Sequence, residues 1–112
     1  MALRRTNVET LQSRLEGKAS MIAPEPTLSS DPSWFGFSIT LHPGYPVDRE
    51  ALVRFLRNQK MRTGLTFAGK ILEQPAYRNI DARVLGNRMN TDFVMNQSSW
   101  VGVYPVLTFQ ML

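Results

Sequence analysis

The side chains that most often carry out chemistry are sparse in this sequence. His42 is the single histidine, it lies in a His-Pro-Gly-Tyr-Pro turn, and the chain has no cysteine. Ser38, His42 and Asp48 could formally supply a hydroxyl, imidazole and carboxylate set, but nothing in their spacing fixes a geometry. The absence of cysteine excludes disulfides, thiolate zinc sites and thiol nucleophiles within this chain. We therefore expect His42 to be an exposed turn residue.

The acidic residues and the glycines form no ligand pattern either. The nine Asp and Glu residues show no paired spacing and no calcium-loop pattern. The sequence has neither G-x-G-x-x-G nor G-x-x-x-x-G-K-[ST], the two glycine patterns that cradle phosphates. We predict no catalytic, no cofactor-binding and no metal-binding residue in the chain itself.

Basic side chains outnumber acidic ones by 13 to 9, and ten of the 13 are arginine. The planar arginine fork suits carboxylates and phosphates, which weakly indicates an anionic partner. The arginines form no block, so solvated helix faces are the favoured interpretation. The alternative is an RNA-stacking platform made of Trp34, Phe35 and Phe37. Core packing of Phe35 and Phe37 is favoured over it, because both share a strand face with Ile39 and Leu41.

The composition predicts one globular domain. The chain has 112 residues, of which 43% are hydrophobic and 20% are charged, so a packed core is feasible and disorder is excluded. No apolar run approaches the roughly 18 residues of a membrane span, and no apolar stretch follows Arg4-Arg5 as in a secretory signal. A cytoplasmic location fits these observations.

Helical and strand periodicities alternate along the chain. Apolar spacing predicts helices over 3–16 and 48–60, the second capped by Asp48, and a last helix that starts at Asn90 or Thr91 and runs through Gln97. Strands are expected over 34–41, 61–66 and 99–104, with a proline-rich connector over 20–33. This order predicts an α/β (α+β) two-layer sandwich, a short sheet with helices on one face.

The strand over 34–41 has the clearest pattern. Strict alternation places Phe35, Phe37, Ile39 and Leu41 on one face, and Trp34, Gly36, Ser38 and Thr40 on the other. After the last strand, residues 108–112 resemble the first turn of a helix, and we expect them to be frayed or anchored only by Phe109.

Several short motifs, taken in order, are familiar. They are Ser30-Asp31-Pro32-Ser33-Trp34-Phe35-Gly36-Phe37, Thr66-Phe67-Ala68-Gly69-Lys70, Gln74-Pro75-Ala76-Tyr77, Asn90-Thr91-Asp92-Phe93-Val94-Met95-Asn96 and Trp100-Val101-Gly102-Val103-Tyr104-Pro105. Together they resemble the C-terminal small domain of the DegT/DnrJ/EryC1/StrS sugar aminotransferase family. The most similar branch is the PMP-dependent CDP-4-keto-6-deoxyglucose-3-dehydrase of lipopolysaccharide O-antigen (3,6-dideoxysugar) biosynthesis.

The resemblance implies a piece of a longer enzyme. Residues 1–17 would be an interdomain helix, and residues 18–112 the small domain of a type I PLP-dependent aminotransferase fold, truncated at its last helix. The large PLP-binding domain would be absent from this chain. It would hold the PMP or PLP and, in some members, an iron–sulfur cluster. The intact enzyme would be a cytoplasmic homodimer that removes the C3 hydroxyl of a nucleotide-sugar, and the fragment alone is predicted to be inactive.

The resemblance also implies where this chain would meet the substrate. Arg62, Thr63, Phe67, Ala68, Gly69 and Lys70 are the predicted substrate wall. Lys70 stands where the family pattern has asparagine, so it is either a charge partner for the diphosphate or an exposed replacement without a role, and Arg62 and Thr63 could simply end a strand. Alternatives from other classes are a stand-alone basic α/β module that binds nucleic acid or protein, and a non-catalytic remnant.

Overall fold

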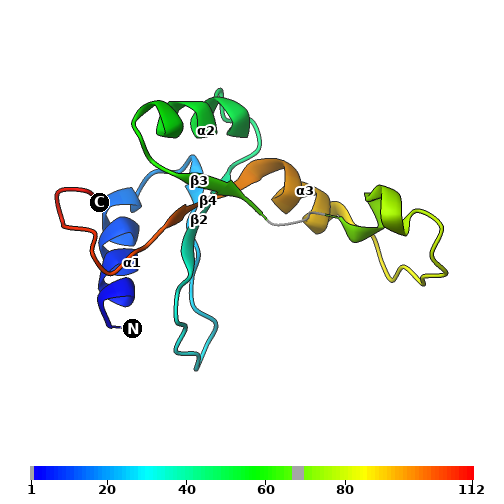
Figure 1. Ribbon diagram of the computed structural model, residues 1–112, viewed down its shortest axis with the longest axis horizontal. Coiled ribbons are helices and arrows are strands. Elements are labelled where there is room, and N and C mark those ends of the chain that lie inside the picture. The colour runs from blue at the N-terminus through cyan, green and yellow to red at the C-terminus, as the bar shows by residue number, and fades with distance from the viewer. Residues whose placement is uncertain (1, 67–69) are drawn as a thin grey trace.

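The computed structural model describes residues 2–66 and 70–112 (Figure 1). Its helices are α1 (Ala2–Leu15), α2 (Arg49–Asn58) and α3 (Met89–Gln97), with two short 3₁₀ turns, η1 (Ile71–Glu73) and η2 (Pro75–Tyr77). Its strands are β1 (Met21–Ile22), β2 (Gly36–Leu41), β3 (Thr63–Leu65) and β4 (Ser98–Gly102). In the described ranges no helix has the length and apolar character needed to span a membrane.

The four strands form one antiparallel sheet in the order β1-β2-β4-β3. The central pair, β2 and β4, places Phe37 opposite Val101 and Ser38 opposite Trp100. The last strand of the sheet, β3, pairs with β4 through Gly64 opposite Trp100 and Leu65 opposite Ser99. The three predicted strands are thus present. The structure adds β1, which lies in the proline-rich connector and, at two residues, is too short to show an alternating pattern.

The core lies between α1 and one face of the sheet. Val8 of α1, Phe37 and Ile39 of β2, and Val103 after β4 form a buried cluster. Leu52 of α2 packs against the same cluster, so α1 and α2 both cover this face. This arrangement confirms the predicted two-layer α/β fold, because the apolar side of an alternating strand must be covered by amphipathic helices.

Local hydrogen bonds set both ends of α2, from a side chain at its start and from the backbone at its end. Asp48 Oδ1 accepts a hydrogen bond from the Ala51 amide at 2.7 Å, which confirms the predicted N-cap. At the other end the Lys60 and Met61 amides donate to the carbonyls of Arg57 and Leu56, at 2.9 Å each. These two bonds are a Schellman motif, and Lys60 takes its left-handed position with φ 62° where glycine is usual.

Two residues before β2 lie on the faces opposite to those predicted. Phe35 is 63% exposed and its ring lies 5.2 Å from that of Trp100, whereas Trp34 packs against the core cluster. The predicted alternation failed here because β2 begins only at Gly36, so the two preceding residues are not held by the pleat. From Phe37 onward the pattern holds.

The end of the chain is tied to α1. Asn7, which is buried, donates a 2.6 Å hydrogen bond from Nδ2 to the Tyr104 carbonyl. The Arg14 guanidinium lies 4.1 Å from the centroid of the Phe109 ring and donates to the Phe109 carbonyl at 3.2 Å. Residues 109–111 form a turn rather than a helix, and Phe109 does serve as an anchor.

Residues 70–97 form a projecting arm. Figure 1 shows η1, η2 and α3 extending from the sheet on the side away from α1. The arm has no buried residue, whereas every buried side chain belongs to the rest of the described chain, which we call the body (residues 2–66 and 98–112). α3 begins at Met89, slightly earlier than predicted, because the Asn87 side chain accepts from the Met89 amide at 3.4 Å.

Candidate functional site

The predicted substrate wall runs along β3 and beyond it. Arg62 is exposed just before β3, and Thr63 accepts a 3.1 Å hydrogen bond from Arg57 Nε. Phe67, Ala68 and Gly69 lie outside the described residues. Lys70 lies past the other end of the strand, and within the described ranges no hydrogen bond or ion pair joins it to Arg62 or Thr63. The wall therefore has two separate described parts.

Arg62 lines a groove to which Lys70 does not contribute. The groove has a volume of about 500 Å³ and lies between α1, the turn after α2 and the last residues of the chain. Leu11, Val101 and Met111 are among the apolar residues that line it. Arg62 and Lys70 therefore belong to different surfaces.

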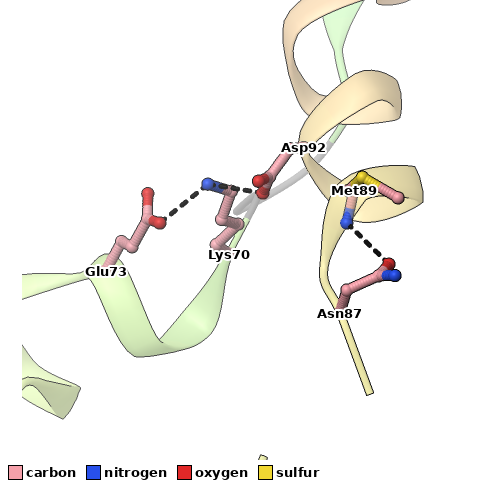
Figure 2. A network of polar contacts seen from close by, with 5 residues as sticks. All are labelled: Lys70, Glu73, Asn87, Met89 and Asp92. Carbon is pink, nitrogen blue, oxygen red and sulfur yellow. Dashed lines mark hydrogen bonds and ion pairs between the residues drawn. The ribbon is translucent and has the colours of Figure 1, made fainter. Parts of the chain in front are cut away.

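Lys70 is held by two carboxylates, as Figure 2 shows. Its Nζ lies 2.5 Å from Asp92 Oδ1 in the first turn of α3 and 2.7 Å from Glu73 Oε1 in η1. We call these three residues the clasp. Only 14% of the Lys70 side chain is exposed, so Lys70 is not the freely solvated lysine that surface replacement would give.

The clasp fixes the charge state of Lys70. The close contact with Asp92, followed by that with Glu73, raises the pKa of Lys70 above its ordinary value of 10.5. An ammonium with a raised pKa is a poor nucleophile, because the neutral amine is scarce at physiological pH. Lys70 therefore acts as a cation in this arrangement.

A hollow lies beside Thr66, the last described residue before the clasp. Phe35, Gly36, Ser38, Thr66 and Trp100 line it, and its volume is about 190 Å³. It opens on the sheet face opposite the core. Two hydroxyl groups and two aromatic rings surround it, yet it is smaller than the roughly 300–1,000 Å³ of a complete small-molecule pocket. The hollow is one side of a larger cleft at most.

The indole ring of Trp100, which lines this hollow, lies against two glycines of the sheet. A Cβ at Gly36 would lie 2.7 Å from the indole Cε3, and one at Gly64 would lie closer still to the indole. The indole Nε1 donates to the Leu65 carbonyl at 3.0 Å. Glycine at these two positions lets the ring lie flat on the sheet, and the hydrogen bond fixes it to β3.

The candidates from other function classes find little support. Phe37 is fully buried, so it cannot stack on a base. His42 is exposed, as predicted, and within the described chain no hydrogen bond joins it to Ser38 or Asp48. Nor does that part of the chain contain a group of three His, Cys, Asp or Glu side chains that could hold a metal ion.

Several arginines are engaged inside the fold rather than displayed to a partner. Arg4 and Arg5 donate to the carbonyls of Trp34 and Pro32, and Arg5 also pairs with Asp31 at 2.9 Å. Arg49 donates from Nη1 to the Met95 carbonyl at 2.5 Å. These contacts use the arginine fork to tie segments together, which argues against a basic nucleic-acid-binding face.

The sequence of the whole chain matches one protein family. A sequence profile described as the DegT/DnrJ/EryC1/StrS aminotransferase family matches residues 1–111. The chain belongs to this family.

Relatives of known role are considerably longer than this chain. The lipopolysaccharide biosynthesis protein RfbH of Salmonella typhimurium is 44% identical over 110 residues, covering 97% of this chain and 25% of RfbH. The dTDP-4-dehydro-2,6-dideoxy-D-glucose 3-dehydratase of Saccharopolyspora spinosa is 40% identical over 109 residues, covering 97% of this chain and 24% of that enzyme. The chain thus spans about a quarter of the length of these curated relatives.

Solved structures share the fold. GDP-4-keto-6-deoxymannose-3-dehydratase (ColD), crystallised with GDP-perosamine, matches with a TM-score of 0.88 at 23% identity, over 97% of this chain and 28% of that chain. The E. coli enzyme with bound hydrated PLP matches equally well. DesV of S. venezuelae, in complex with a ketimine intermediate, gives a TM-score of 0.81 at 19% identity, over 98% of this chain and 28% of that chain. The aminotransferase-type fold expected from the motifs is confirmed.

Sequence reasoning singled out Lys70 but missed what holds it. Glu73 follows Lys70 at i+3, a spacing that favours ion pairs on one helical face, and this signal could have been used. Asp92 is 22 residues away and no local signal connects it to Lys70. The role of Trp100 was also missed, although glycine at positions 36 and 64 hints that something large approaches the backbone.

Proposed function

We propose that this chain is part of a PMP- or PLP-dependent nucleotide-sugar 3-dehydratase of lipopolysaccharide deoxysugar biosynthesis. The observation that carries the proposal is the 40% identity to a dTDP-sugar 3-dehydratase over nearly the whole chain, supported by 44% identity to RfbH. Within that enzyme, residues 1–17 would be the interdomain helix and residues 18–112 the small C-terminal domain. The enzyme would work in the cytoplasm as a homodimer.

The chain's own residues do not fit the cofactor. A lysine that forms a Schiff base must be available as a neutral amine, whereas the clasp keeps Lys70 charged and engaged. The solved relatives bind PLP, and three quarters of their length has no counterpart in this chain. We therefore assign the cofactor, and any iron–sulfur cluster, to the part of the enzyme outside this chain.

The contribution of the chain would be one wall of the substrate cleft. The hollow beside Thr66 offers two hydroxyl groups and the Trp100 ring, and such a surface suits a sugar, which presents hydroxyl groups and a flat C–H face. The predicted wall residues Arg62, Thr63, Phe67, Ala68, Gly69 and Lys70 are retained in this proposal. Their role would be to orient the nucleotide-sugar rather than to transfer protons.

A chimera tests the proposal. The matching quarter of the Saccharopolyspora 3-dehydratase would be replaced by this chain, and the product would be assayed for loss of the C3 hydroxyl from the substrate named for that enzyme. We expect a folded enzyme that binds PLP and dehydrates this substrate at a measurable rate. A folded, PLP-loaded chimera with no dehydratase activity would contradict the proposal, provided that the unmodified enzyme is active in parallel.

A further inference from the structure

Thr66 and Lys70 both contact one continuous piece of chain. Thr66 Oγ1 donates to the Ser98 carbonyl at 3.4 Å, and Lys70 pairs with Asp92. Asp92 and Ser98 belong to α3 and β4, which follow each other without a break. Because β4 also pairs with β3, Thr66 and Lys70 are each tied to residues 92–99.

The charge of the clasp argues against a direct role in substrate binding. One ammonium and two carboxylates give a net charge of −1, and a nucleotide diphosphate is itself an anion. Lys70 Nζ already donates a hydrogen bond to Glu73 and forms an ion pair with Asp92. A diphosphate would therefore meet a neutralised cation and a surplus of negative charge.

We propose that Lys70 is a positioning residue, which Asp92 and Glu73 hold so that it fixes η1 and the Lys70 end of the substrate wall against α3, and that it is not the partner of the substrate diphosphate. The positioning of a substrate wall rests on the proposed function. Asp92 is the more important partner, because it joins parts of the chain 22 residues apart. Glu73 pairs with Lys70 within a single turn and can do so without the tertiary fold.

The first test uses this chain alone. Backbone amide hydrogen exchange would be compared for the unmodified chain, Asp92→Asn, Glu73→Gln and Asp81→Asn. Asp81 is an exposed carboxylate of the arm and serves as the matched control. We expect faster exchange over residues 71–77 in Asp92→Asn, a smaller change in Glu73→Gln and none in Asp81→Asn. Unchanged exchange in Asp92→Asn would overturn the proposal.

The second test uses the chimera, in which the two possible roles of Lys70 predict changes of KM in opposite directions. If Lys70 positions the wall, Asp92→Asn should raise KM by about twofold to fivefold, the effect of losing a partly exposed ion pair, with kcat little changed. Asp92→Glu should restore most of the loss. If Lys70 instead binds the diphosphate, Asp92→Asn frees the ammonium and should lower KM, an effect that shrinks as salt rises.

The two tests keep this proposal separate from the proposed function. A lowered KM would overturn the positioning role while leaving the dehydratase assignment intact. An inactive chimera would count against the proposed function. Hydrogen exchange on the chain alone would still decide whether the clasp holds residues 71–77 against α3. In an active chimera, a Lys70→Met, Asp92→Asn double variant should be no worse than Lys70→Met alone, since both changes break the same contact.

Discussion

The body and the arm are held together by different forces. The body contains every buried hydrophobic side chain of the described residues, and Phe37, Leu41, Val8 and Val103 are at most 1% exposed. The arm buries none and exposes Leu85 by 74%. It is joined to the body through the chain itself and the Arg49 to Met95 hydrogen bond, whereas the clasp lies wholly within the arm and ties η1 to α3. The body is therefore specified by packing, and the internal arrangement of the arm depends on charge.

This difference indicates which substitutions and conditions should affect the stability of each region. Packing energy grows with buried apolar area and is insensitive to salt and pH, so the body should respond most to changes of volume. Ion pairs at a partly exposed site are weaker and depend on protonation and ionic strength. Because the clasp lies in the arm, the Lys70 end of the proposed substrate wall belongs to the more adjustable part of the molecule.

The largest effect on stability should come from truncating an isoleucine to alanine in the body, compared with the same change in the arm. Ile39 is 8% exposed in the body and Ile71 is 56% exposed in the arm. Ile39→Ala should lower the free energy of unfolding by about 2–5 kcal/mol, whereas Ile71→Ala should change it by no more than about 0.5 kcal/mol. Urea denaturation measures both. Equal losses would show that the arm is packed as tightly as the body.

A smaller effect is expected where Trp100 lies on the backbone. Gly64→Ala should destabilise the chain by about 1–3 kcal/mol, because the new methyl group collides with the indole. Trp100 fluorescence, recorded in a Trp34→Phe background, should shift at the same time. Gly44→Ala is the control: it has φ +82° and open space, so it should cost about 1–2 kcal/mol through backbone strain and leave the emission unchanged. An unshifted spectrum in Gly64→Ala would show that the indole is not seated as described.

The end of α2 should be improvable. Lys60→Gly should stabilise the chain by about 0.5–1 kcal/mol, because glycine adopts the left-handed φ of this Schellman position without a Cβ penalty. The reverse change, Gly17→Lys, at φ +77° just after α1, should destabilise it by a similar amount. Thermal unfolding monitored by circular dichroism measures both, and a lower melting temperature for Lys60→Gly would be evidence against the motif.

The smallest effect on global stability should come from titrating Lys70. Its pKa in the folded chain is raised above 10.5, so the folded state binds the proton more tightly than the unfolded state. The stabilisation is fully present below pH 10.5 and is lost as the pH rises through the folded pKa. Urea unfolding of the wild-type chain and Lys70→Met should therefore differ below this pH and converge above it. Lys18→Met is the control: it changes an exposed position and should alter the free energy of unfolding by no more than about 0.5 kcal/mol.

The sequence by itself determined the three helices, the three longer strands and their order. Strict alternation from Phe37 to Leu41 required a strand with one covered face, and Asp48 set the start of α2 through a bond to a residue three positions away. The motifs from Ser30 to Pro105 were enough to indicate the family, because their order survives without knowledge of contacts. These features depend on local spacing, which is written directly in the chain.

The tertiary structure alone decided what the candidate site residues do. It paired Lys70 with Asp92, separated Arg62 from Lys70, and placed Trp100 over Gly36 and Gly64. It also turned Phe35 toward Trp100, because β2 begins only at Gly36, the residue after Phe35. These contacts depend on which segments the fold, with its sheet order β1-β2-β4-β3, brings side by side, and residues 22 to 65 positions apart carry no local pattern that indicates such a contact.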